Sequence, residues 1–65
     1  MSIKHNNHNL KSVFPANLPF AKCLNYLRSL NINFLNLGNL IICPEYQCLL
    51  FFKNAYLIDI QFLQS

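Results

Sequence analysis

Four side chains in this sequence could in principle bind one metal ion. His5 and His8 lie near the start, and Cys43 and Cys48 flank a Pro-Glu-Tyr-Gln segment in the second half. Two imidazoles and two thiolates suit tetrahedral zinc. The spacing fits poorly, because only two residues separate the histidines, whereas finger-type sites place about three to five residues between them. A zinc mini-domain built on these four residues is therefore only a weak hypothesis, and no cofactor is expected.

The cysteines could instead form a disulfide bond. Three cysteines are present, Cys23 being the third, so one would remain unpaired. Nothing resembling a secretion signal indicates an oxidising compartment. Free and mostly buried thiols are the expectation.

This chain contains few residues of the types that perform catalysis. Glu45 and Asp59 are the only two acidic residues, and each has a simple structural role, in a turn and on a strand face. Gly38 is the only glycine, so the chain cannot form a glycine-rich phosphate loop. We expect no enzyme activity and infer no small-molecule substrate.

The composition itself is unusual. Twelve leucines and ten asparagines make up a third of the 65 residues, whereas Gly, Ala, Val, Asp and Glu together supply seven. Those five depleted types have codons that begin with G, while Asn, Ile, Phe and Tyr codons are rich in A and T. The first hypothesis is therefore a short orphan or fortuitous AT-rich open reading frame product without an evolved biochemical activity.

Charge and hydropathy support a different hypothesis. Only 11% of residues are charged and 54% are apolar, so many apolar side chains have no polar cover, and aggregation or self-association is expected. The basic residues of the first half are spaced too widely for nucleic-acid binding. The alternative function is therefore a small hydrophobic interaction protein or one that associates with a membrane surface.

Targeting signals are not convincing in this sequence. The early apolar stretch around Val13 and Phe14 is too short for a signal peptide. The segment from Phe34 to Phe52 contains several polar residues and is not a good transmembrane helix. The compartment stays unassigned.

The chain divides into residues 1–16, expected to form a flexible polar arm, and residues 17–65, expected to form one small α+β unit of low stability. Asn17 is the predicted N-cap of an amphipathic helix at about 18–30. Its apolar stripe recurs at helical spacing, in Phe20, Cys23, Leu24, Leu27 and Leu30.

A short antiparallel β-meander, at about 32–62, is expected after the helix. A turn is predicted at Lys53-Asn54. Beyond it a two-residue alternation favours a strand, with Tyr56, Ile58, Ile60 and Phe62 on one face and Ala55, Leu57, Asp59 and Gln61 on the other. A helical periodicity also fits residues 48–63, so helix and strand both remain open for this segment.

Overall fold

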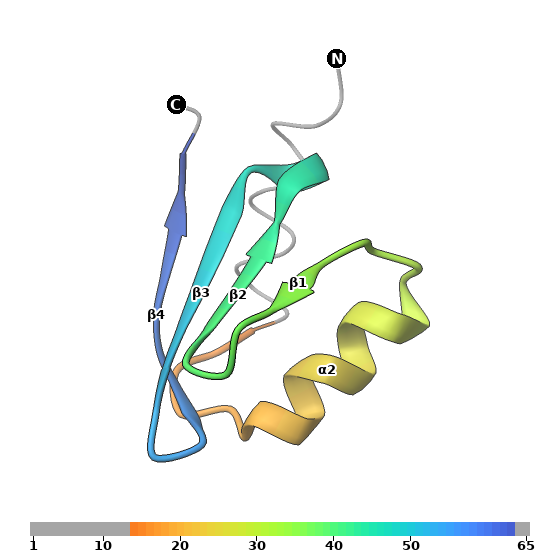
Figure 1. Ribbon diagram of the computed structural model, residues 1–65. Helices are drawn as coiled ribbons and strands as arrows, with labels where there is room; N and C mark the ends of the chain where they lie inside the picture. The colour runs from red at the N-terminus through yellow and green to blue at the C-terminus, as the bar shows by residue number, and fades with distance from the viewer. Residues whose placement is uncertain (1–13, 64–65) are drawn as a thin grey trace.

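Within residues 14–63, which the computed structural model of the protein describes, a helix is followed by a four-stranded antiparallel sheet (Figure 1). The elements are α2 (Phe20–Ser29), β1 (Leu35–Asn36), β2 (Leu40–Cys43), the 3-10 helix η1 (Pro44–Tyr46), β3 (Cys48–Lys53) and β4 (Tyr56–Phe62). The strands lie in sequence order, β1-β2-β3-β4. This confirms the predicted small α+β fold, and residues 48–63 adopt the strand alternative.

The start of α2 differs from the prediction. Asn17 is not its N-cap: the cap position is Pro19, and no side chain caps the helix. Asn17 instead adopts a left-handed conformation, with φ of 68°, and its N–H donates to the Leu57 carbonyl at 2.9 Å. The Leu57 N–H in turn donates to the Leu18 carbonyl at 2.9 Å. These hydrogen bonds to β4 hold the segment in place, and the helix therefore begins only at Phe20.

The end of α2 follows from an asparagine. Asn31 adopts φ of 57°, a left-handed conformation that asparagine tolerates better than most residues. Its N–H donates to the Arg28 carbonyl at 3.1 Å, and the Ile32 N–H donates to the Leu27 carbonyl at 3.0 Å. This pair of bonds is a Schellman motif, and the buried side chains of Leu27 and Ile32 supply its apolar contact.

Tight turns join the strands. Between β1 and β2, Gly38 has φ of +88°, and its N–H donates to the Asn36 Oδ1 at 3.0 Å. Between β3 and β4, Asn54 and Ala55 both have positive φ, 53° and 68°. Two consecutive positive φ values are typical of a type I′ hairpin turn, whose twist matches that of the flanking strands.

A β-bulge in β4 changes the predicted alternation. Phe52 pairs with Leu57 but Phe51 pairs with Asp59, so Ile58 is an extra residue opposite β3. Leu57 therefore lies in the core and Ile58 lies outside it, 56% exposed. The prediction that Ile58 shares a face with Ile60 was wrong, because an alternation of residue types in the sequence does not reveal where a bulge inserts an extra residue.

The core lies between α2 and one face of the sheet, which we call the inner face. Cys23 and Leu27 of α2 are completely buried against it, and the rings of Phe20 and Phe52 meet edge to face at 4.9 Å. Phe14, which was expected in the flexible polar arm, is 2% exposed and belongs to this core. The inner face of the sheet supplies the remaining fully buried side chains, Ile41, Cys43, Cys48, Leu50 and Leu57.

The β3–β4 turn gives a test of this backbone geometry. Ala55 holds a conformation that costs an L-residue about 1–2 kcal/mol and glycine almost nothing. Replacing it in the variant Ala55→Gly should therefore raise the free energy of unfolding by about 1 kcal/mol, measured by urea denaturation. The matched control, Ala21→Gly in the exposed part of α2, should lower it by about 0.5–1 kcal/mol. Destabilisation by Ala55→Gly would contradict the turn.

Candidate interaction surface

Of the four candidate zinc ligands, the structure brings two together. Cys43 ends β2 and Cys48 begins β3, and the two are direct partners in the register of the hairpin. His5 and His8 lie outside the described residues. Among residues 14–63, no group of three or more histidine, cysteine or acidic side chains is arranged to hold a metal ion.

All three thiols are free and completely buried. Desolvation raises the pKa of Cys23 and of Cys43 to about 11. The pKa of Cys48 rises to about 12, again mainly through burial and also through the neighbouring Cys43. Nucleophilic and metal-binding chemistry both need the thiolate, so these cysteines are poorly suited to either in the folded protein.

The two carboxylates lie on separate elements. Glu45 lies in η1, where its Oε2 accepts a hydrogen bond from the Asn33 side-chain amide at 3.3 Å. Asp59 lies in β4, where its Oδ2 accepts one from the Gln61 amide at 3.1 Å. Both therefore have local structural partners, and the absence of enzyme activity stays a prediction.

The surface that remains is the sheet face opposite α2, which we call the open face. The strand register builds it in two rows. One row runs Leu35–Ile42–Leu49–Gln61, and the other runs Leu40–Phe51–Asp59, with Ile58 beside it at the bulge. Because side chains alternate along a strand, the residues of the two rows project away from the buried inner face. Ile58 lies at the edge of this face, where the bulge interrupts the alternation.

The open face is unusually apolar for a sheet surface. Antiparallel sheets that pack on one side usually alternate apolar residues inward with polar residues outward. Here Leu35 is 55% exposed and Ile58 is 56% exposed, and the other apolar members of the two rows are half-buried. Leu37, in the turn after β1, adds a side chain that is 60% exposed. The result is one patch of neighbouring aliphatic and aromatic groups.

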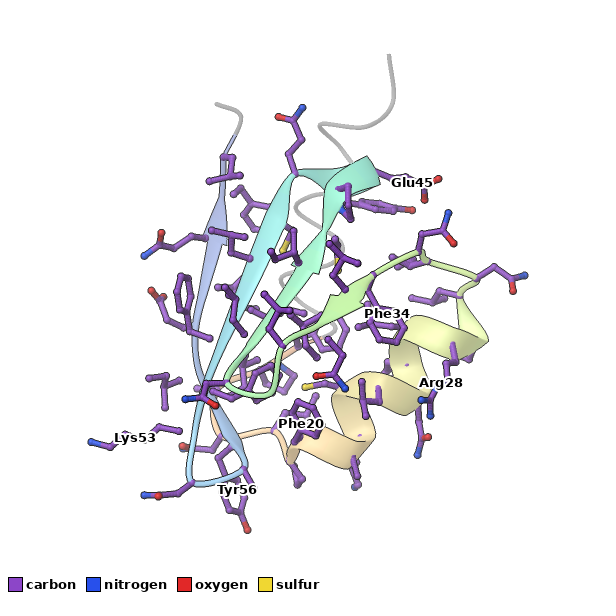
Figure 2. All side chains as sticks on the ribbon, in the orientation of Figure 1. Phe20, Arg28, Phe34, Glu45, Lys53 and Tyr56 are labelled. Carbon is purple, nitrogen blue, oxygen red and sulfur yellow. The ribbon has the colours of Figure 1, made fainter. Side chains whose placement is uncertain are left out.

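The described part of the chain, residues 14–63, places few charged side chains on this face. Asp59 lies within it, and Lys53 lies at its end, where the side chain points away from α2 (Figure 2). The other described cations, Lys22 and Arg28, belong to α2 on the opposite layer. The open face is therefore close to neutral.

Sequence reasoning missed this surface. The overall signal was present in the low charge content and the apolar excess, but only the strand pairing places the exposed groups side by side.

Among residues 14–63, no helix has the length and apolar character that crossing a membrane requires.

Alkaline pH should weaken the fold through the buried thiols. An unfolded thiol ionises near pH 8.5, whereas those of Cys43 and Cys48 ionise at about 11 and 12 when folded. Their contribution to stability is therefore complete below about pH 8.5 and is lost as pH rises from about 9 to 12, at no more than about 1.4 kcal/mol per pH unit for each thiol.

Urea denaturation at about pH 8 and about pH 10.5 measures this loss, since the two values fall on either side of the start of thiol ionisation. The variant Cys48→Ala should lose less stability between them than the parent chain does. The two proteins share every other titratable side chain, so the comparison isolates the contribution of Cys48. An identical pH dependence in the two proteins would contradict the burial of Cys48.

The chain matches no protein-family model, and no curated protein or solved structure matches it either.

Proposed function

We propose that this chain is a small interaction protein that self-associates through its open face. The observation that supports the proposal is the apolar patch on that face, which joins Leu35, Ile42 and Leu49 across three neighbouring strands. Burying such groups is favourable by about 25 cal/mol per Å² of apolar surface. A monomeric protein rarely keeps a large continuous patch of this kind in contact with water.

The distribution of charge favours a protein surface over a membrane surface as the occupant. Peripheral proteins that bind anionic lipid combine an apolar patch with a surrounding group of lysines and arginines. Among residues 14–63, Lys53 and Asp59 offset each other on the open face, and Lys22 and Arg28 lie on the opposite layer. A neutral apolar face suits contact with another neutral apolar face.

A second copy of the chain meets this requirement. Two sheets can pack face to face at a spacing of about 10 Å, with their strands at about 30° to each other. A standard interface buries about 800 Å² on each partner, which is about a fifth of the 4390 Å² accessible surface of this molecule.

Two matched leucines provide the test. Leu35→Lys places a charge on the open face, and Leu30→Lys places the same charge at the end of α2, where the side chain is 50% exposed. Sedimentation equilibrium should give a dimer for the parent chain and for Leu30→Lys. Leu35→Lys should dissociate at least about tenfold more readily, since each dimer would bury two lysines.

Three results would contradict the proposal. A parent chain that stays monomeric at every concentration would favour the hypothesis of a chain without an evolved activity. An open-ended series of larger species would indicate aggregation and no closed dimer. Equal weakening by the two lysine variants would place the contact away from the open face. Circular dichroism establishes that both variants retain the fold.

A further inference from the structure

Cys43 and Cys48 occupy positions that allow a bond between strands. The Phe52 N–H donates to the Asn39 carbonyl at 2.8 Å, so residues 39 and 52 form a hydrogen-bonded pair. Hydrogen-bonded and non-bonded pairs alternate along an antiparallel ladder, and two steps of two residues lead from this pair to Cys43 and Cys48. Hydrogen-bonded partners have their Cα atoms about 5.5 Å apart, within the 4.4–6.8 Å that disulfides span.

Both side chains also lie on the same side of the sheet. Cys43 and Cys48 are each completely buried on the inner face, in the cluster that contains Leu50 and Ile41. A pair on opposite faces, or one step out of register, could not be bridged without rebuilding the hairpin. Cys23, the third thiol, lies on α2 in the other layer and has no such register with either of them.

We propose that Cys43 and Cys48 form a reversible disulfide that closes the β2–η1–β3 hairpin under oxidising conditions. With glutathione disulfide as oxidant, the thiolate of one cysteine attacks a sulfur of glutathione disulfide and releases one glutathione thiolate. The second cysteine then loses its proton and attacks the protein sulfur of the mixed disulfide, releasing a second glutathione. Two protein thiols are oxidised and one glutathione disulfide is reduced to two glutathione molecules, which carry away the two protons.

The burial of both sulfur atoms determines at which stage this reaction can occur. Neither sulfur is reachable in the closed hairpin, and both thiols resist ionisation there. The first attack therefore requires the η1 end of the hairpin to open, or takes place before the hairpin has formed. Oxidation is slow in the folded protein and fast during refolding.

The bond is expected to be reversible because the two cysteines occupy a hydrogen-bonded pair of the ladder. Opposed side chains at hydrogen-bonded positions have Cβ atoms about 5.5 Å apart, whereas disulfides prefer about 3.8 Å. Closing the bridge draws the strands together and stores strain, and strained disulfides are the more easily reduced ones. The bridge should therefore form and break within the range of glutathione buffers.

Refolding the full chain in a mixture of reduced and oxidised glutathione tests the proposal. Trypsin separates Cys23, in peptide 23–28, from Cys43 and Cys48, which share peptide 29–53. Mass spectrometry should find peptide 29–53 lighter by two hydrogen atoms and peptide 23–28 with a free thiol. Further cleavage after Glu45 should give two fragments that stay joined until a reductant is added.

The bridge should also change stability in a way that depends on these two residues. Closing a loop of this size should raise the thermal midpoint by several degrees, less than loop entropy alone predicts because of the strain. Cys23→Ala should keep the shift, and Cys43→Ala should abolish it. Stable mixed glutathione adducts on peptide 29–53, or a link between that peptide and Cys23, would overturn the proposal.

Discussion

The register of β3 with its two neighbours is the constraint on which the rest of this structure depends. β3 pairs with β2 on one side and with β4 on the other, so neither of its edges is free. Its side chains then alternate strictly: Cys48, Leu50 and Phe52 point to α2, while Leu49 and Phe51 point the other way. A shift of one residue would exchange the two sets and put Lys53 into the core.

Both the core and the open face follow from that register. The inner set meets Cys23 and Leu27 of α2 and is excluded from water. The outer set contains equally apolar residues, because this chain has few charged residues to place there. The same pairing that completes the core therefore leaves an apolar surface on the other side of the sheet. The low charge content of the sequence therefore shows itself in the structure as one apolar face of the sheet.

The sequence predicted the order of the elements but not their details. The helical stripe and the β-rich second half were visible because periodicity is a local property, and the α+β fold is confirmed. Three details depended on tertiary contacts: Asn17 pairs with Leu57 and does not cap the helix, Phe14 belongs to the core, and a bulge turns Ile58 outward. None of these contacts leaves a signal in the spacing of nearby residues.

The candidate sites show the same division between local and tertiary information. The residue types of Cys43 and Cys48 made them candidate metal ligands. The fold shows instead that they are direct partners across a hairpin, which their types alone did not indicate. The open face could not be located before the strands were paired. Composition indicated an excess of apolar surface, and only the register assigned it to one side.

In the dimer that we propose, the open face is exposed in a single chain and covered by a second copy. Methyl NMR with a soluble gadolinium chelate measures this directly. In dilute solution the chelate should broaden the methyl signals of Leu35, Ile42 and Ile58, and at high protein concentration these signals should become protected, while Leu30 stays broadened throughout. Open-face methyl groups that remain broadened at every concentration, or that are protected even at high dilution, would contradict this account.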